Sequence, residues 1–368
     1  MKKLLYVGLD VDDKSFHIGA FCSETVETFE LTSKPTLGNL MQKLKKLQDQ
    51  DFQIKLCYEA TYIGYSLYRL LRKENIDAEI IAPSLIPELA NKRVKTDRLD
   101  ANKMAVYYAK GLLTKIYVPT EEDEHERDLI RSRSFLIEQR KALKKHILST
   151  CRRHNLHYKQ GNSTASHWTT THTTWLINEV NKLSGSLRSA LDLLIFQLEK
   201  LDECIDNFDQ KIKELSETEK YKKKKDSLNC FRGVDTLTAM TLITEIGDVK
   251  RFKHPKQLTS YAGLDITEYS SGGKEKKFGI TKMGNKRIRT AAIESCQRVE
   301  KANRLSKRLK DQRQGQDVKI IDVADRCMKR LKTKSNHLLE AGKHRNKVKV
   351  ACAREFLNFI WEALQIAA

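Results

Sequence analysis

Four acidic residues stand where carboxylates could act together. Asp10 closes the first apolar run of the chain, and Glu59 closes a later one. Asp97 and Asp100 are three residues apart, so on a helix their side chains lie on one face. Four neighbouring acids repel one another unless cations bind, and such hard oxygen ligands suit magnesium or manganese. Because two such ions can hold a phosphodiester for in-line displacement, the spacing predicts a metal site for phosphoryl chemistry.

Each acid also has a simpler interpretation. Asp10 alone could be a turn residue at the end of a strand. Asp97 and Asp100 could be a helix N-cap and an acid in the first helical turn, a common arrangement. This second interpretation explains the pair but does not explain Asp10 and Glu59, so we favour the metal site.

The elements that must position these acids follow from the periodicity of the apolar residues. The pattern predicts strands over 4–12, 14–22, 26–31, 53–58 and 78–81, and helices over 37–49, 63–74 and 99–109. Three antiparallel strands followed by alternating helices and parallel strands is the order of the ribonuclease-H-like fold. In such an open sheet the first and fourth strands can be neighbours, which would bring Asp10 and Glu59 to one edge. We therefore predict an α/β domain over residues 1–118.

A helical middle region is predicted over residues 119–228. Leucines recur every seven residues within 129–143. A longer seam alternates steps of four and three residues: Leu187, Leu191, Leu194, Leu198, Leu201, Ile205, Phe208, Ile212 and Leu215. This a/d pattern predicts a coiled coil, which either folds back on the helix over 127–150 or joins two protomers. A charged linker is expected at 222–225.

The remaining residues, 229–368, are predicted to form a mainly α-helical domain. The segment around Gly233 resembles the second half of a helix–hairpin–helix, in which a glycine turn offers backbone N–H groups to a DNA phosphate. Further on, Gly272 and Gly273 would let the backbone approach a phosphate closely. Taken alone, the segment from Ser270 to Lys274 is typical of a flexible loop. A basic helix start then carries Lys282, Lys286, Arg287 and Arg289.

The charge of the chain is uneven. The net charge is +20, and residues 281–354 hold 22 Lys and Arg against 7 Asp and Glu, a net +15. Such an excess indicates a polyanionic partner, most simply nucleic acid. No apolar run approaches the roughly 18 residues of a membrane span, and residues 1–3 do not begin a signal peptide. We therefore expect a cytoplasmic protein with no membrane partner.

The eight cysteines form no C-x-x-C pair, which is typical of reduced thiols in a cytoplasmic protein. Cys151, His154 and His157 recur every three residues. On a helix this spacing could suggest zinc, but no fourth ligand cluster follows.

Taken together, these motifs resemble the DEDD-type insertion-sequence transposases, which are serine recombinases guided by a bridge (seeker) RNA. The resemblance covers nearly the whole chain. It rests on Gly8-Leu9-Asp10, Tyr58-Glu59-Ala60-Thr61, Lys95-Thr96-Asp97-Arg98-Leu99-Asp100, Tyr261-Ala262-Gly263-Leu264, Ser271-Gly272, and Thr281-Lys282 with Gly284-Asn285. Two departures occur, at Tyr62 where the family often has Gly and at Ile266 where it has Pro.

The resemblance implies a ribonuclease-H-like (RuvC-like) domain, a coiled coil, and a transposase domain carrying a catalytic serine. By position, the acids are Asp10, Glu59, Asp97 and Asp100, and the nucleophile is Ser271, although Ser270 stands beside it. The implied cofactor is Mg²⁺ or Mn²⁺. The implied partners are donor and target DNA, a structured guide RNA, and further copies of the chain in a dimer or tetramer.

Three other function classes compete with this interpretation. A metal-dependent DNA nuclease or Holliday-junction resolvase would use the four acids and would not need the serine. An actin-like ATPase also ends its first strand in Gly-x-Asp, but it would need further glycine-rich phosphate loops, which the sequence lacks. A non-catalytic RNA-binding scaffold would tolerate loss of Asp10.

Overall fold

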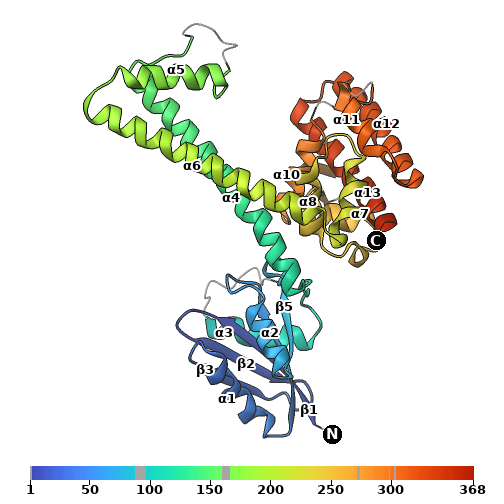
Figure 1. Ribbon diagram of the computed structural model, residues 1–368. Coiled ribbons are helices and arrows are strands. Elements are labelled where there is room, and N and C mark those ends of the chain that lie inside the picture. The colour runs from blue at the N-terminus through green and yellow to red at the C-terminus, as the bar shows by residue number, and fades with distance from the viewer. Residues whose placement is uncertain (1, 88–96, 160–165, 272–273, 298, 302–303) are drawn as a thin grey trace. The chain divides into compact units, whose positions relative to one another are not determined.

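The computed structural model describes residues 2–87, 97–159, 166–271, 274–297, 299–301 and 304–368 (Figure 1). For residues 97–99, 269–271, 274–277 and 300 it describes the backbone alone. The chain divides into two compact units, Met1–Pro119 and Thr120–Ala368. The second unit contains both regions that the sequence separates at residue 228, so the three-domain division stays a prediction.

The first unit is built on one sheet. Its elements are β1 (Lys3–Val11), β2 (Phe16–Cys22), β3 (Thr28–Ser33), α1 (Leu37–Gln48), β4 (Phe52–Glu59), α2 (Ser66–Lys73), β5 (Asp77–Ile81), the 3-10 helix η1 (Pro83–Leu85) and α3 (Asp97–Ala109). The described strands form a five-stranded sheet in the order β3-β2-β1-β4-β5. The pairs β1–β2 and β2–β3 are antiparallel, whereas β1–β4 and β4–β5 are parallel. The predicted strand order and the adjacency of the first and fourth strands are thus confirmed.

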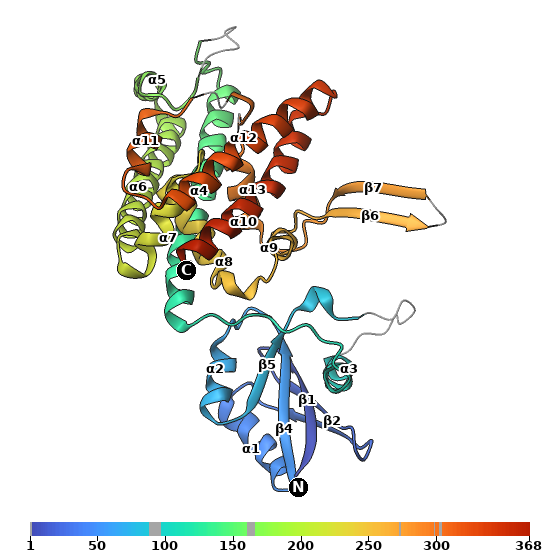
Figure 2. The same ribbon diagram turned by 90° about the vertical axis from the view of Figure 1, so that its right-hand side faces the viewer.

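Helices cover both faces of this sheet (Figure 2). On one face Leu5, Val7 and Leu9 of β1 pack into a core with α1 and α2. On the other face Cys57 of β4 packs against Met104 of α3. Because both faces are covered, residues 4–9 of β1 form a continuous run without a charged side chain, as is typical of buried strands.

The backbone of α3 lies directly on the sheet. A Cβ atom at Gly8 would come within 2.2 Å of the carbonyl oxygen of Ala101, and one at Gly19 would come within 2.3 Å of Oδ1 of Asn102. Both strand positions therefore require the smallest side chain, since a methyl group would lift α3 away from β1 and β2.

The second unit is mainly helical. Its elements are α4 (Glu121–Arg153), α5 (Thr170–Asn181), α6 (Gly185–Ser216), α7 (Glu219–Asn229), α8 (Thr236–Ile246), η2 (Val249–Arg251), α9 (Pro255–Tyr261), β6 (Ile266–Ser271), β7 (Lys274–Ile280), α10 (Lys286–Ser295), η3 (Val299–Lys301), α11 (Lys307–Arg313), α12 (Val318–Glu340) and α13 (Arg345–Ala367). No helix in the described ranges is both long and apolar enough to cross a membrane.

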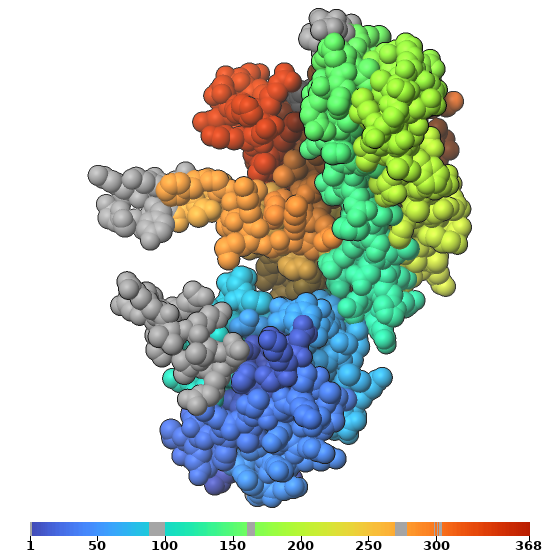
Figure 3. Space-filling model, turned by 90° about the vertical axis from the view of Figure 1, so that its left-hand side faces the viewer, coloured from blue at the N-terminus to red at the C-terminus, as the bar shows by residue number. Residues whose placement is uncertain are grey.

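Helices α4 and α6 pack side by side and form an arm, which is green in Figure 1 and in the space-filling view of Figure 3. The apolar seam of α6 faces the inside of this pair: Leu191, Leu198, Leu201, Ile205 and Ile212 are buried. Arg140 of α4 binds Asp202 of α6 at 2.8 Å, and Arg133 binds Asp209. The seam thus has a partner within the chain, while a coiled coil and its use between protomers stay predictions.

The expected charged linker at 222–225 is wrong, because these residues lie within α7. Lys225 is buried, and its ammonium group binds the carboxylates of Glu217 and Asp226, each at 2.7 Å. The lysine-rich stretch is therefore part of a helix that packs on the C-terminal core. That core surrounds α13, where Phe356 meets Phe231 edge-to-face at 6.2 Å between ring centroids.

Candidate functional site

Asp10 and Glu59 occupy matching places on neighbouring strands. In the parallel β1–β4 register Leu9 is opposite Tyr58, so the two acids are the next residues along their strands. Both are half-buried. The carboxyl ends of parallel strands are where ligands bind in open α/β sheets. The sheet thus brings these two predicted site residues to one edge.

The direction of α3 places its first turn towards the same edge. The ring of Tyr6 packs on that of Tyr108 with centroids 5.6 Å apart, whereas Gly8 lies beneath Ala101. Helix α3 therefore runs opposite to β1, and its earliest residues lie towards Asp10. Strand alternation puts Asp10 on the same face as Tyr6 and Gly8.

Glu59 belongs to the α3 face as well, because Cys57, two residues before it, packs on Met104. Asp97 and Asp100 are in the first turn of α3, and Asp100 is half-buried. The side chain of Asp97 lies outside the described residues. Among the side chains that are described, no three His, Cys, Asp or Glu groups are clustered as metal ligands.

Two further groups beside the acids were missed by the sequence reasoning. His17 of β2 is the register partner of Asp10, and its Nε2 lies 3.2 Å from Oγ of Ser15. Directly opposed residues of a strand pair point to the same face, so His17 shares the face of Asp10. A histidine in an alternating strand next to the acid-bearing strand is the signal that could have revealed it.

Tyr62 is the second group, and it stands at one of the departures from the family pattern. Its hydroxyl donates a hydrogen bond to Asp13, which raises the pKa of Tyr62 to about 12. This contact links the chain after β4 to the chain after β1. A glycine at position 62 could not form this hydrogen bond.

Ser271 lies at the tip of a β-hairpin. It is the last residue of β6 and pairs with Lys274, the first residue of β7, so the loop expected around Ser270 is instead largely strand. The side chains of Ser270, Ser271 and Lys274 lie outside the described residues, as do Gly272 and Gly273 altogether. The hairpin projects from the helical core of its unit (Figure 2).

The base of this hairpin, here called the hairpin root, comprises residues 261–265 and 281–285. Gly284 has φ +137°, and a Cβ there would come within 2.3 Å of the carbonyl oxygen of Tyr261. The backbone N–H of Thr281 donates to Asp265 at 2.8 Å, and that of Lys282 to Gly263 at 3.1 Å. These two motifs of the sequence are therefore one interlocked structure.

The predicted nucleic-acid-binding residues have different surroundings. Lys282, Lys286 and Arg287 are exposed. Arg289 is half-buried, and its guanidinium donates to the carbonyl oxygen of Ala262 at 2.7 Å, so it holds the hairpin root. Gly233 has φ +83°, and a Cβ there would meet the carbonyl oxygen of Ser295 at 2.3 Å, so packing explains this glycine.

A buried carboxylate, Glu245 of α8, was also missed. Its side chain is 1% exposed and receives two hydrogen bonds from Arg131 of α4, each of 2.8 Å. Asn285 donates a third at 2.7 Å, and Nε of Arg287 lies 3.8 Å away. Burial alone would raise the pKa of Glu245, but the bonds from Arg131 and Asn285 outweigh it and lower that pKa.

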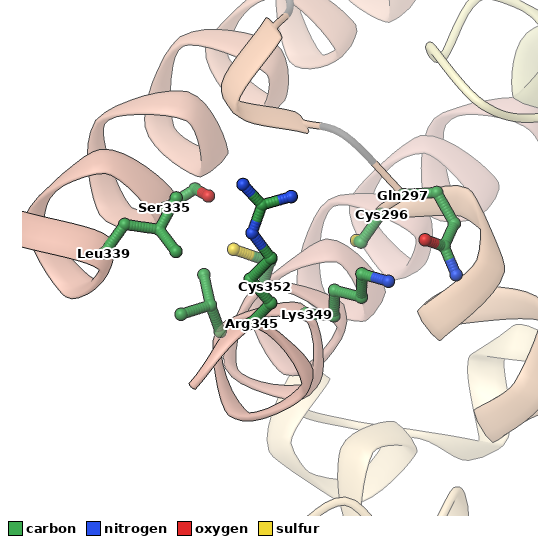
Figure 4. Close-up of a pocket in the computed structure, with 8 residues that line it drawn as sticks. Cys296, Gln297, Ser335, Leu339, Arg345, Lys349 and Cys352 are labelled. Atoms are coloured by element: carbon green, nitrogen blue, oxygen red, sulfur yellow. The ribbon is translucent and has the colours of Figure 1, made fainter. Parts of the chain in front are cut away.

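A pocket of about 220 Å³ opens in the C-terminal core (Figure 4). It is lined by Cys296, Gln297, Ser335, Leu339, Arg345, Val348, Lys349 and Cys352. Arg345 and Lys349 contribute cationic groups from α13, and the two cysteines are buried. The three residues whose spacing could suggest zinc have different surroundings, since Cys151 is buried while His154 and His157 are exposed.

Comparison with known proteins decides the family. Residues 226–310 match the model of the transposase IS116/IS110/IS902 family, and residues 7–155 match a DEDD transposase model of IS110. The chain is 31% identical to "Putative transposase y4qE" of Sinorhizobium fredii, over 88% of this chain and 78% of that protein. It is 29% identical to the transposase for insertion sequence element IS1533 of Leptospira borgpetersenii, over 92% of this chain and 97% of that one.

The chain belongs to the IS116/IS110/IS902 family of transposases. The two matched segments correspond to the two parts of this insertion-sequence transposase that carry the predicted chemistry. The N-terminal match contains all four acids, and the C-terminal match contains the hairpin with Ser271. As a transposase the protein acts on DNA, which agrees with the basic excess in residues 281–354.

Proposed function

We propose that this transposase cuts and rejoins DNA strands through an acidic metal site and a serine nucleophile, with a structured RNA as guide. The observation that carries the proposal is the matched position of Asp10 and Glu59 at the ends of β1 and β4, with the first turn of α3 directed towards them. The strand order is that of a ribonuclease-H-like (RuvC-like) fold, which supports the same conclusion.

The residues at this edge fit a divalent cation. Asp10, Glu59, Asp97 and Asp100 would offer only carboxylate oxygens, the donor type that Mg²⁺ and Mn²⁺ prefer. When bound, the cation would neutralise charge on the phosphoryl oxygens of DNA. The α3 face is closely packed at Gly8, so the acids are held on regular elements rather than on loops.

Ser271 would supply the nucleophile. Its Oγ attacks a DNA phosphorus atom, a phosphoserine bond forms, and a phosphorus–oxygen bond of the DNA breaks. The serine proton is lost and the departing DNA oxygen takes up a proton, so a free hydroxyl end results. The phosphoester energy is retained in the adduct, and rejoining to a new hydroxyl end needs no further energy source.

The helical parts would hold the nucleic acids and further copies of the chain. Lys282 lies in the hairpin root and Lys286 and Arg287 follow it directly, all three are exposed, and cations are concentrated through residues 281–354. Phosphate contacts of this kind give affinity without sequence preference, and base pairing to the guide RNA would supply the sequence. The α4–α6 arm would act as the coiled coil of a dimer or tetramer.

The test traps cleavage products formed with DNA, guide RNA and Mg²⁺ and separates them under denaturing conditions. We expect a protein–DNA adduct in the wild type that is absent in Ser271→Ala and present in Ser270→Ala. Ser271→Ala removes one oxygen atom and little volume, so folding should survive.

Other outcomes would contradict the proposal in different ways. An adduct that persists in Ser271→Ala but vanishes in Ser270→Ala would move the nucleophile by one residue. Cleavage without an adduct, undiminished in both variants, would favour a metal-dependent nuclease or resolvase that uses the acids alone.

A further inference from the structure

The hairpin with Ser271 is attached to the rest of its unit through a small root. A two-stranded ribbon is only marginally stable by itself, so its direction depends on what holds residues 261–265 and 281–285. At about 3.4 Å per residue the six residues of β6 extend roughly 20 Å from the root. A rotation of roughly 10° at the root would therefore move the tip by roughly 3 Å, and misplacement by about 1 Å is enough to slow catalysis strongly.

Asn285 joins the root to Glu245, in addition to the contact of Arg289 with the carbonyl oxygen of Ala262. Its backbone N–H donates to the carbonyl oxygen of Tyr261 at 2.7 Å, which joins the two halves of the root. Its Oδ1 accepts from the backbone N–H groups of Arg287 and Ile288 and caps α10. Its Nδ2 remains for a third contact, and it donates to Glu245 at 2.7 Å.

Glu245 connects this root to the arm. The carboxylate accepts two hydrogen bonds from the Arg131 guanidinium, a planar two-bond contact that fixes orientation as well as distance. Arg131 lies in α4, Glu245 in α8 and Asn285 before α10. A buried carboxylate is stable only with such partners, so one side chain joins three segments that are remote in sequence.

We infer that Glu245 is a positioning residue, which fixes the direction of the β6–β7 hairpin relative to the α4–α6 arm through Arg131 and Asn285. The inference rests on the proposed function only in that Ser271 is the group being positioned. Glu245 itself does not touch the reacting atoms in this inference. It determines where the hairpin tip lies.

The experiment measures the hairpin direction without any DNA cleavage. Spin labels are attached to Cys204, the exposed cysteine on α6, and to a second thiol introduced as Phe278→Cys on β7, where the side chain is 60% exposed. The other seven cysteines are buried. Electron–electron double resonance then gives the distribution of label distances in the full-length protein.

Asn285→Ser and Glu245→Gln are the two informative variants. Serine can still cap α10 but cannot reach Glu245, so Asn285→Ser removes the link and keeps the cap. We expect a narrow distance distribution in the parent and a broadened or shifted one in both variants. Glu199→Gln, which changes an exposed carboxylate of α6, should leave it unchanged.

An unchanged distribution in Asn285→Ser, which is the milder variant, would overturn the inference even if Glu245→Gln failed to fold. Adduct formation at Ser271 should slow by roughly 100-fold in Asn285→Ser with DNA affinity retained. If the variants broaden the distance distribution while the parent protein forms no adduct at Ser271, the positioning role of Glu245 is supported and Ser271 is rejected as the nucleophile. Failure of the positioning role and failure of the proposed nucleophile thus give different results.

Discussion

Gly8 of β1 and Gly19 of β2 are register partners, and both lie beneath α3. The absence of two side chains at this one place lets the helix that bears Asp97 and Asp100 rest directly on the strand that bears Asp10. The arrangement of the acids therefore depends on two residues that carry no functional group.

Gly8→Ala should displace α3. The new methyl group would stand 2.2 Å from the carbonyl oxygen of Ala101, so we expect a loss of about 1–3 kcal/mol in the free energy of unfolding, as in overpacked cores. DNA cleavage should fall further than stability explains. Urea titration and a cleavage assay measure the two effects. Gly38→Ala in α1 is the matched control, because a Cβ there meets nothing within 4 Å. Equal stability and equal cleavage in Gly8→Ala and Gly38→Ala would refute the role of Gly8.

Asp10→Asn should abolish Mg²⁺-dependent strand cleavage and leave nucleic-acid binding largely intact. The change removes a negative charge from the sheet edge but keeps the size of the side chain. Cleavage and gel-shift assays with the same DNA measure both properties. Asp49→Asn at the exposed end of α1 is the control. Normal cleavage by Asp10→Asn would rule out the acidic metal site.

Leu198→Ala should destabilise the arm by about 2–5 kcal/mol, because this side chain is only 7% exposed in the seam between α4 and α6. Leu193 lies on the same helix and is 68% exposed, so Leu193→Ala should change stability by less than about 0.5 kcal/mol. Thermal unfolding measures the difference. Light scattering on both variants reports the oligomer: a lower mass for Leu198→Ala without early melting would mean that the seam joins protomers instead.

Glu245 should make the free energy of unfolding depend on pH in the acidic range. Its pKa is lowered in the folded protein, whereas an unfolded glutamate titrates near about pH 4.3. The stabilisation is therefore complete above about pH 4.3 and is lost as pH falls through the lower folded value. The glutamine of Glu245→Gln cannot titrate. The difference in free energy of unfolding between the parent protein and this variant should therefore shrink as the pH falls from about 6 to about 3. A difference that is constant with pH would contradict this assignment.

Lys286 and Arg287 should contribute directly to phosphate binding, whereas Arg289 should not. Affinity for duplex DNA should fall with salt, with a log–log slope of about −0.9 for each phosphate that the protein neutralises. Lys286→Gln and Arg287→Gln should each make this slope shallower. Arg289→Gln should mainly lower stability, because its guanidinium holds the carbonyl of Ala262. Fluorescence anisotropy across a salt series provides the slopes, and salt-independent binding would contradict the interpretation.

The sequence by itself determined the order of the strands, the positions of Asp10 and Glu59 at strand ends, and the apolar seam of α6. These features follow from local periodicity, which each element carries in its own residues. The sequence allowed β1 and β4 to be neighbours, and the sheet of the structure confirms that they are.

Only the tertiary structure decided the surroundings of Gly8, Lys225 and Glu245. A glycine in a strand, a lysine in a charged run and a lone glutamate have no local pattern that reveals their partners. Arg131 and Glu245 are 114 residues apart, and their contact exists because α4 and α8 pack together. Ser271 likewise belongs to a strand only because Lys274 pairs with it. Such contacts depend on which elements meet, and that is set by packing of the whole unit rather than by any single segment.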